Sequence, residues 1–543
     1  MKYLSPLEML YKWEKEKPDE IYLSQPIDGI WHNWTWRDVG IEVRKMAAYL
    51  KSLQLPEGSK IALLSKNCAH WMMTDLAIMM SGNISVPLYP NLNPETLSKI
   101  LHHSESKLLF IGKLDNFNEM RPGIPSDMEC ISFPFYSENF PIWDKLTENI
   151  NPLNQDIIRD PNDLATIIYT SGTTGDPKGV MHKFYNFSFA TSNAVSFLHL
   201  EQEVFFSYLP LCHIAERLLV QMGSLYGGGK VFFAESLDTF SVNLQEASPT
   251  VFLGVPRIWT KFQQGILKKI PQKKMDIFLK IPVISYLVKR KIRRSLGLNK
   301  ARNVFTGAAP TPVSLIKWFS ILGINIQEAY AMTENTCYSH VSYKDNVKVG
   351  SVGKPLPHCN VRLSDKKEIL IKHDALMDGY YKMDAETNKT IINGWLHTGD
   401  EGFIDNMGYL TITGRVKDLF KTSKGKYVAP SPIEMKLSAN KNIEQVCVVG
   451  TGLPNPIAIA VLSDRGLDTI ESQLITSLNN TLNIVNNKLD HHERLNNCII
   501  VKDRWTVENK LLTPTMKIKR NAIEKLYQEF YLDWYGGDKI TIL

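Results

Sequence analysis

The chain has 543 residues, of which 44% are hydrophobic and 22% charged, and its formal net charge at pH 7 is +6. This length exceeds that of one ordinary core, so we expect at least two domains, and the composition argues against disorder. A charge this small gives no reason to expect nucleic acid as a partner. Seven scattered cysteines without a CxxC pair indicate neither a zinc site nor a disulfide framework.

The N-terminal segment MKYLSPLEMLYKWEKEKPDE contains no uninterrupted apolar stretch of the kind that a secretory signal requires. No window of the sequence reaches the roughly 18 uncharged apolar residues of a membrane-spanning helix. We therefore expect a cytoplasmic protein, whose contact with a membrane would be peripheral and at the inner surface.

Short apolar runs alternate with helix-like patterns in the first half of the chain. Residues 61–65 and 84–90 are typical of strands, and the stretch between them is typical of a helix. Similar apolar runs begin at Leu108, Ala165, Val231, Val251 and Asn303. This alternation predicts α/β layers with largely parallel sheets, whose ligand-binding loops lie at the strand ends.

The segment YTSGTTGDPKG, residues 169–179, directly follows one of these runs. Its glycines let a ligand approach the backbone, its hydroxyl and NH groups can bind phosphate oxygens, and its lysine supplies a counter-charge. The alternative for a Ser/Gly stretch is a flexible surface loop, and the Walker A pattern is absent. The candidate nucleotide-binding residues here are Thr170, Ser171, Gly172, Thr173, Thr174, Gly175 and Lys178.

Residues 268–300 combine basic and apolar character. Eleven Lys and Arg stand against one acid, Asp276, and apolar residues fill the middle of the stretch. One interpretation is a surface element that rests on anionic lipid. The alternative interpretation, which the sequence supports to the same degree, is a solvated amphipathic helix that packs on the body of the protein.

The pattern of expected strands and helices changes near Gly414. The segments EQVCVVG and AIAVLS are typical of strands, residues 474–489 of a helix, and a charged helix is expected from Ile518 onward. We place a domain boundary in the segment GRVKD, residues 414–418. The predicted domains are residues 1–414 and residues 415–543.

The 169–179 segment resembles the phosphate-binding loop of the adenylate-forming superfamily, which includes acyl-CoA synthetases, luciferases and peptide-synthetase adenylation domains. Eight further segments match in the superfamily's order and extend the resemblance over nearly the whole chain: LPLCHIAER, GVPRIW, TGAAP, EAYAMTEN, GSVGKPLP, GWLHTGD, GRVKD and LLTPTMKIKR. The resemblance implies a large N-terminal domain of layered α/β sheets and a small, mobile C-terminal α+β domain.

The resemblance also implies roles for individual residues. Thr173 and Glu334 match the positions that hold Mg²⁺, and both offer the hard oxygen ligands that this ion prefers. Lys517 matches the catalytic lysine that the small domain carries into the site, and His213 matches the histidine on the substrate side. These four residues form the expected catalytic set.

The nucleotide would also be held by residues of four other segments. Tyr330 offers a flat face to adenine, small residues of TGAAP let the base come close, and a carboxylate and a guanidinium match the positions that bind the ribose hydroxyls. The superfamily commonly has glycine after this tyrosine, where the present chain has Ala331, whose methyl group is expected to narrow the pocket. The expected nucleotide contacts are Gly307, Ala308, Ala309, Tyr330, Thr333, Asp400 and Arg415.

Two lysines are expected to serve the change between half-reactions, Lys417 by its match to the hinge position and Lys421 as part of the loop that follows it. Lys417 occupies the hinge about which the small domain rotates, and Lys421 is the expected contributor to the second step.

The segments LPLCHIAER, GVPRIW and LTPTMKIKR resemble the long-chain fatty acyl-CoA synthetase branch. The expected reaction is therefore the ATP-dependent, Mg²⁺-requiring activation of a long-chain fatty acid as an acyl-adenylate, followed by transfer to coenzyme A. One alternative is a ligase that loads an acyl carrier protein, and another is a nucleotide- or acyl-binding protein without turnover. The sequence predicts no oligomeric state.

Overall fold

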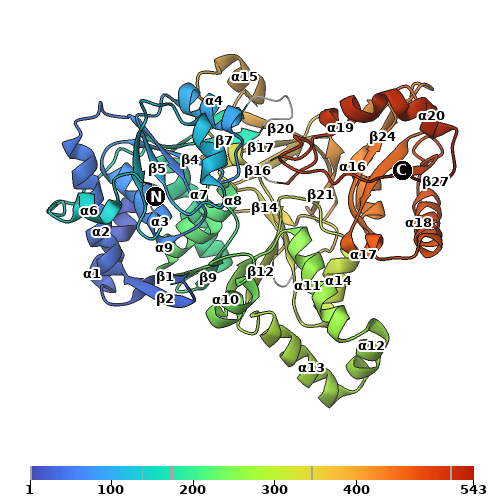
Figure 1. Ribbon diagram of the computed structural model, residues 1–543, viewed down its shortest axis with the longest axis horizontal. Helices are drawn as coiled ribbons and strands as arrows, with labels where there is room; N and C mark the ends of the chain where they lie inside the picture. Colours follow the sequence, from blue (N-terminus) through green and yellow to red (C-terminus); the bar gives the residue numbers. More distant parts are fainter. Residues whose placement is uncertain (1–2, 137–138, 172–176, 344–346, 514–515) are drawn as a thin grey trace.

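The computed structural model describes residues 3–136, 139–171, 177–343, 347–513 and 516–543. Within these residues the chain forms five β-sheets, of which the two largest lie in the N-terminal part. The C-terminal residues, orange to red in Figure 1, form a separate domain beside it. The expectation of layered α/β sheets with a small C-terminal α+β domain is confirmed.

One large sheet has, in the described ranges, seven strands in the order β18-β8-β7-β4-β3-β5-β6. The strands from β7 to β6 are parallel, and β8 returns antiparallel to β7. Apolar runs predicted four of the strands because parallel strands are buried on both faces. The bounds are β3 Lys60–Leu64, β4 Ile84–Leu88, β5 Leu108–Ile111, β6 Glu129–Ser132, β7 Leu164–Ser171, β8 Pro177–Lys183 and β18 Gly379–Tyr380.

The second large sheet has, over the same ranges, nine strands in the order β15-β14-β13-β12-β11-β9-β10-β1-β2. The six strands from β13 to β1 are parallel, so their carboxyl ends share one edge of the sheet. The bounds are β1 Ile21–Ile27, β2 Ile30–Thr35, β9 Val204–Ser207, β10 Lys230–Phe233, β11 Val251–Leu253, β12 Asn303–Thr306, β13 Gln327–Tyr330, β14 His340–Val341 and β15 Lys354–Pro355.

Helix α3, Ala69–Met80, lies between these two sheets. All of its residues are buried, and it contacts β3 and β4 of one sheet and β1 of the other. Its sequence is apolar all round, as expected for a helix without a solvent face. The other helices of this part are α1 Pro6–Glu16, α2 Trp36–Ser52, α4 Pro94–Ser104, α5 Phe117–Met120, η1 Arg121–Gly123, α6 Trp143–Thr147, α7 Phe184–Leu198, α8 Ile214–Glu216, η2 Arg217–Met222, α9 Gly223–Gly227, α10 Phe240–Ala247, η3 Thr333–Asn335, α14 Val313–Ile321 and α15 Asp384–Thr390.

Residues 268–300 fold mainly into a helical hairpin. Helix α11, Pro256–Lys269, leads into α12, Gln272–Lys280, and α13, Pro282–Ser295, which pack against each other. The hairpin projects from the lower edge of the molecule in Figure 1. In the described part of the chain, no helix is both long and apolar enough to cross a membrane.

A smaller sheet connects the N-terminal part to the C-terminal domain. Its strands are β16 Asn360–Leu363, β17 Glu368–Lys372, β19 Ile391–Ile392, β20 Trp395–Ile404 and β21 Leu410–Arg415. The short hairpin β22 Phe420–Lys421 and β23 Tyr427–Val428 follows. The boundary between residues 414 and 415 stays a prediction, and Arg415 is the last residue of β21.

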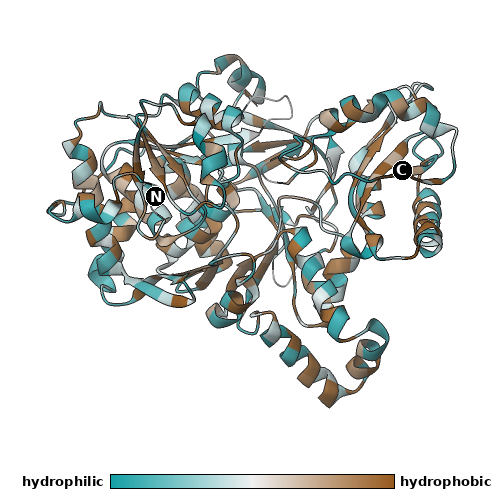
Figure 2. Ribbon diagram, viewed as in Figure 1, coloured by the Kyte–Doolittle hydropathy of each residue, from teal (hydrophilic) through white to brown (hydrophobic). Residues whose placement is uncertain are grey.

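The C-terminal domain is built on a sheet in the order β24-β25-β26-β27. Its hydrophobic clusters draw on residues from Phe420 onward, and Figure 2 shows apolar residues on its strands. The expected helix over 474–489 is found at Glu471–Asn486, whereas the helix expected from Ile518 begins at Arg520 because Ile518 bridges to Leu512. The bounds are α16 Pro430–Leu437, β24 Ile443–Val449, β25 Ile457–Leu462, α17 Asp464–Leu467, α18 Glu471–Asn486, β26 Cys498–Val501, α19 Arg520–Tyr527, η4 Gln528–Phe530, α20 Tyr531–Tyr535 and β27 Ile540–Ile542.

A buried ion pair joins α3 to the π-helical turn η2. Arg217 donates to Asp75 at 2.6 Å, and both side chains are fully buried. Arg217 also donates to Thr166 on β7 at 2.7 Å, and Gln221 donates to Asp75 at 2.8 Å. One polar cluster therefore ties the helix layer to the strand that leads into the 169–179 loop.

We expect Arg217→Met to lower the free energy of unfolding by about 3–5 kcal/mol, because Asp75 would remain as a buried charge without its cation. The matched control is Arg37→Met, since Arg37 pairs with Asp19 at 3.0 Å with side chains 56% and 84% exposed. Such an exposed pair contributes under about 1 kcal/mol. Urea denaturation followed by tryptophan fluorescence measures both, and equal effects would contradict a structural role for the buried pair.

Candidate functional site

Two neighbouring strand ends bring predicted residues together. Strands β12 and β13 are parallel, with Thr306 opposite Glu328, so the segments that follow them leave the same edge of the sheet. Strand β12 continues into Gly307, Ala308 and Ala309, whereas β13 ends at Tyr330 and leads into η3 with Thr333 and Glu334. These segments were predicted to lie around the adenine and the metal ion.

The turn after β12 has little room beside its backbone. A Cβ added to Gly307 would lie 3.2 Å from the carbonyl oxygen of Ala329 on the neighbouring strand. Ala308 adopts φ 65°, in the left-handed region that few residues other than glycine occupy. The close backbone approach and the left-handed conformation favour small residues in the TGAAP segment. Ala308 and Ala309 remain exposed.

Tyr330, Asp400 and Arg415 form one hydrogen-bonded group. The Tyr330 hydroxyl donates to Asp400 Oδ2 at 2.7 Å, and Arg415 Nε lies 3.2 Å from Asp400 Oδ1. Asp400 and Arg415 face each other across β20 and β21. Burial raises the pKa of Asp400, while Arg415 and the Tyr330 hydroxyl oppose that shift. The two residues predicted for the ribose are therefore held together with the residue predicted for the adenine.

Lys517 reaches this group from the C-terminal domain. Its backbone NH donates to Thr513 Oγ1 at 3.0 Å. Surrounding protein and the charge of Arg415 lower the pKa of Lys517, whereas Asp400 and Glu334 raise it. The side chain nevertheless remains exposed. An ammonium group that is crowded by protein and still accessible suits an encounter with an anionic ligand.

His213 lies in the loop after β9, at the start of α8. Its Nδ1 accepts a hydrogen bond from the Ala215 backbone NH at 3.2 Å. Burial and the charge of Lys517 lower the pKa of His213 to about 4, so the ring is neutral at pH 7. The charge of Lys517 lowers the pKa of His213 and also that of Asp400, so the three residues influence one another electrostatically.

Glu334 and Lys178 are linked by a residue that the sequence analysis missed. The Tyr380 hydroxyl donates to Glu334 Oε1 at 2.8 Å, and the Lys178 ammonium lies 5.1 Å from the centre of the Tyr380 ring. Lys178 also pairs with Glu386 on α15 at 2.7 Å. Burial and the neighbouring Glu334 raise the pKa of Tyr380, so its hydroxyl remains a donor. In the sequence, Tyr380 and Glu386 are recognisable only as polar residues near an apolar segment. That pattern is too common to identify them as site residues.

Much of the predicted phosphate-binding loop, Gly172, Thr173, Thr174 and Gly175, lies outside the described residues. Thr170 and Ser171 end strand β7, and Lys178 lies on β8 beside the loop. The Thr170 hydroxyl donates to the Lys178 carbonyl oxygen at 3.5 Å.

The described residues contain no cluster of three or more His, Cys, Asp or Glu side chains that could hold a metal ion. Of the two residues predicted to hold Mg²⁺, Glu334 lies in the described part of the chain and supplies a carboxylate. A single carboxylate fits Mg²⁺, which keeps several waters and commonly binds protein through one or two carboxylates together with substrate phosphates.

Lys417, predicted as the hinge, and Lys421, predicted to serve the second step, both follow β21 in the chain. Lys417 is in the turn after β21, and Lys421 is exposed on β22, with its ammonium 5.9 Å from the centre of the Tyr427 ring. Among the described residues, no hydrogen bond or ion pair joins Lys421 to Asp400 or Glu334. Lys517 thus interacts electrostatically with the Asp400 group, whereas the role of Lys421 stays a prediction.

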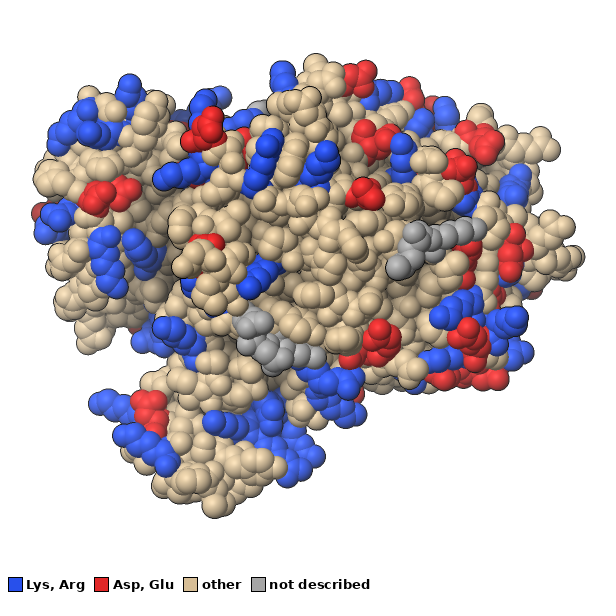
Figure 3. Space-filling view, turned by 180° about the vertical axis from the view of Figure 1, so that it is seen from behind, with Lys and Arg blue, Asp and Glu red and all other residues tan. Residues whose placement is uncertain are grey.

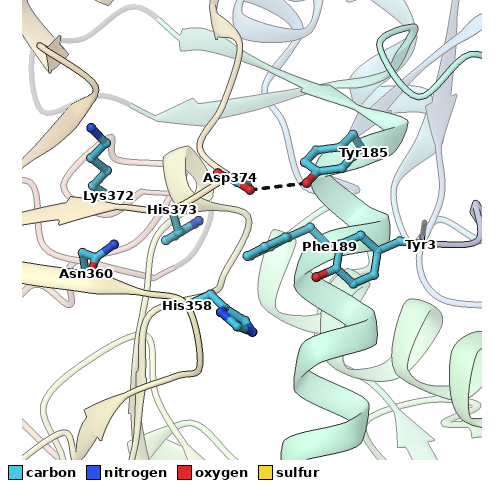
Figure 4. A pocket seen from close by; sticks show the side chains of 8 residues that line it. All are labelled: Tyr3, Tyr185, Phe189, His358, Asn360, Lys372, His373 and Asp374. Carbon is cyan, nitrogen blue, oxygen red and sulfur yellow. Dashed lines mark hydrogen bonds between the residues drawn. The ribbon is translucent and has the colours of Figure 1, made fainter. Parts of the chain in front are cut away.

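A separate cavity of about 470 Å³ opens between α7 and the chain after β17, and Figure 4 shows its lining. Tyr185 donates to Asp374 at 3.3 Å, and the Phe189 and His373 rings stack with centroids 6.2 Å apart. None of the predicted site residues is among its described lining: Tyr3, Tyr185, Phe189, His358, Asn360, Lys372, His373 and Asp374.

Solved structures share this fold. The anthranilate CoA ligase AuaEII in complex with anthranoyl-AMP has a TM-score of 0.80 and 20% identity, over 97% of this chain and 98% of that one. The A-PCP didomain of the carboxylic acid reductase from Segniliparus rugosus, in complex with AMP, has a TM-score of 0.82 and 20% identity, over 99% of this chain and 82% of that one. At this identity the likeness concerns the fold.

Sequence relatives extend over nearly the whole chain. The long-chain-fatty-acid–CoA ligase FadD15 of Mycobacterium bovis is 28% identical over 96% of this chain and 95% of its own length. The long chain acyl-CoA synthetase 5 of Arabidopsis thaliana is 26% identical over 94% of this chain and 87% of its own length. Residues 10–381 match the AMP-binding enzyme family, and residues 417–537 match the AMP-binding enzyme C-terminal domain. The chain therefore belongs to the AMP-binding enzyme family.

Proposed function

We propose that this protein is an ATP-dependent, AMP-forming ligase that converts a fatty acid to an acyl-adenylate and then to an acyl-CoA. The observation that carries the proposal is the position of Lys517, a cation from the C-terminal domain that interacts electrostatically with Asp400, Glu334 and His213 of the N-terminal part. Acid activation needs a positive charge where two anions, a carboxylate and a triphosphate, must meet.

The group formed by Tyr330, Asp400 and Arg415 would bind the nucleoside. An ionised carboxylate accepts hydrogen bonds from both hydroxyls of a ribose, and such charge-assisted bonds are stronger than neutral ones. Arg415 and Tyr330 hold this carboxylate in place before the nucleotide arrives. The Tyr330 ring and the small residues after β12 would then flank the adenine.

In the first step a carboxylate oxygen of the acid attacks the α-phosphorus of ATP, and the bond to the leaving pyrophosphate breaks. Negative charge builds on the oxygens around that phosphorus, and Lys517 would stabilise it more in the transition state than in the ground state. His213 is neutral at pH 7, so it can approach the carboxylate by hydrogen bonding without adding a charge.

Mg²⁺ would supply charge neutralisation at the phosphates when it is bound. Glu334 and Thr173 are the residues proposed to hold it. Tyr380 fixes the orientation of the Glu334 carboxylate by its hydrogen bond, and Lys178 next to it would contact phosphate oxygens after leaving Glu386.

In the second step the sulfur of coenzyme A attacks the acyl carbon, the bond to the AMP phosphate breaks, and the thiol proton is lost to water. The thiol needs room at the acyl carbon, so Lys517 must withdraw. Rotation of residues 415–543 about Lys417 would supply that room and bring the loop of Lys421 toward the site.

A long-chain fatty acid is the proposed substrate. The relatives named above are long-chain ligases at 26–28% identity, and the segments LPLCHIAER and GVPRIW resemble that branch. The competing proposals are an acyl carrier protein as acceptor and a binding protein without turnover.

We expect long-chain acyl-CoA and AMP as products when the protein is incubated with Mg²⁺, ATP, coenzyme A and a mixture of saturated and aromatic acids. Mass spectrometry identifies the thioester and the acid that was chosen. Acyl-adenylate without thioester would redirect the acceptor to a carrier protein, and absence of AMP with every acid would contradict catalysis.

Replacement of the ammonium in Lys517→Gln should slow the exchange of labelled pyrophosphate into ATP by about 10²-fold or more, because one preorganised group at the developing charge is lost. Conversion of supplied acyl-adenylate to acyl-CoA should stay within a few-fold of wild type. The control is Lys502→Gln on an exposed lysine of the same domain. Equal losses in both half-reactions would show that Lys517 does not serve the first step in particular.

Tyr380→Phe should raise the Mg²⁺ concentration needed for half-maximal activity about tenfold, since partners that orient a metal ligand typically contribute 10–100-fold to affinity. Tyr381→Phe is the matched control, because the Tyr381 hydroxyl donates instead to Glu105, at 3.2 Å on the surface. Steady-state titration with Mg²⁺ separates the two variants. An unchanged requirement in Tyr380→Phe would remove Glu334 from the metal site.

A further inference from the structure

The hairpin of α12 and α13 has an apolar tip that faces solvent. Ile277 and Ile281 at the end of α12 are 58% and 45% exposed. Val283, Tyr286 and Leu287 at the start of α13 are 71%, 60% and 55% exposed. Single exposed apolar residues are normal on protein surfaces, but five within eleven residues of one projecting hairpin form a patch, and such patches mark binding surfaces.

The exposed face of α13 changes in character along the length of the helix. Val283, Tyr286 and Leu287 are spaced as one helical face, and the same face continues to Arg290 and Arg294, both of which are exposed. The face is thus apolar near the tip of the hairpin and basic nearer to the body of the protein.

Basic residues form a collar behind the tip. The projecting part at the bottom of Figure 3 is tan at its end, with blue side chains above the end on both sides. The exposed basic residues of the hairpin and its flanks are Lys268, Lys269, Lys273, Lys274, Lys280, Arg290, Lys291, Arg294 and Lys300.

The hairpin is anchored by its other face. Met275 and Ile292 are 1% and 4% exposed and belong to the hydrophobic cluster around Trp259. Gln272 accepts a hydrogen bond from the Trp318 indole of α14 at 2.9 Å. The tip residues therefore remain exposed on an element that has already buried its core-facing side.

We propose that this hairpin docks the protein on a bilayer surface that contains anionic lipid. The apolar tip enters the interface between headgroups and acyl chains, where apolar side chains gain by burial, and the collar contacts anionic headgroups. This docking is a property separate from the proposed activity. Only its purpose, access to a fatty acid dissolved in the membrane, rests on the proposed function.

A lipid surface fits both parts of the hairpin better than other anionic partners do. Nucleic acid is bound mainly through its phosphates, and aromatic stacking would engage Tyr286 but give no use to four exposed aliphatic side chains. Positively charged residues behind an apolar edge match the order of layers in an anionic leaflet, in which the charged headgroups lie outside the hydrocarbon.

Sedimentation with vesicles tests the proposal on the full chain without substrates, so its outcome is independent of the catalytic assignment. The wild-type protein should bind vesicles of phosphatidylcholine mixed with phosphatidylglycerol and not vesicles of phosphatidylcholine alone. Removing four charges in Lys280→Gln, Arg290→Gln, Lys291→Gln and Arg294→Gln should weaken binding at least about tenfold, because each basic residue near such a surface contributes appreciably.

The matched control removes four exposed charges elsewhere, in Lys15→Gln, Lys51→Gln, Lys366→Gln and Lys488→Gln, from the same formal net charge of +6. It should bind as the wild type does. A third variant, Val283→Ser with Tyr286→Ser and Leu287→Ser, should lose binding with its charges intact. Thermal unfolding and turnover of a soluble acid in the absence of vesicles check that the variants fold.

Three results would overturn the proposal: no binding of the wild type to anionic vesicles, equal loss of binding in the hairpin and control charge variants, or unchanged binding in the serine variant. The second would mean that net charge alone attracts the protein. Capture of an acidic protein or nucleic acid by the hairpin, with no vesicle binding, would assign the surface to that other partner.

Discussion

The pairing of Asp400 with Arg415 across β20 and β21 is the constraint on which the candidate site depends. It holds a buried carboxylate beside its counter-ion, and the Tyr330 hydroxyl adds a third fixed partner at 2.7 Å. Strand β21 ends at Arg415, and the chain then enters the C-terminal domain. The same two strands thus form the proposed ribose contact and mark where the chain enters the domain that carries Lys517.

The C-terminal domain is held in this position by contacts that are individually weak. Lys510 pairs with Glu95 at 3.4 Å, with side chains 67% and 62% exposed, and Arg257 pairs with Glu444 with side chains 50% and 20% exposed. Exposed ion pairs contribute about 0–1 kcal/mol each. The domain has its own hydrophobic clusters, so it can change orientation without opening a core. Such a balance suits a site that must serve two half-reactions in turn.

The sequence predicted the parallel strands well, because buried strands are continuous apolar runs. The members of the Asp400 group were named from the resemblance of short segments to a known superfamily. The structure brings them into contact, and their role in binding a nucleotide stays a prediction. The sequence did not predict Tyr380 or Glu386. Tyr380 lies 46 residues from Glu334, and Glu386 lies 208 residues from Lys178, so each contact exists only after the chain has folded. The charged pattern after Ile518 resembled a longer helix, but the bridge from Ile518 to Leu512 uses that residue to build the turn of Lys517. A short-range backbone bridge therefore overrode helix propensity at this position.

Two places in the molecule depart from what stability alone would favour. One is the site, where burial raises the pKa of Asp400, and where the surrounding protein and the charge of Arg415 lower the pKa of Lys517. Both charges therefore exist at an energetic cost that their partners only partly offset. The other is the hairpin, where residues such as Val283 and Leu287 face water although the helix has a buried side. Departures of this kind persist where a ligand supplies the missing partner. A polyphosphate nucleotide would supply the missing partner of Lys517, and an anionic bilayer would supply that of the hairpin. Both surfaces would then be complete only when their ligands are bound.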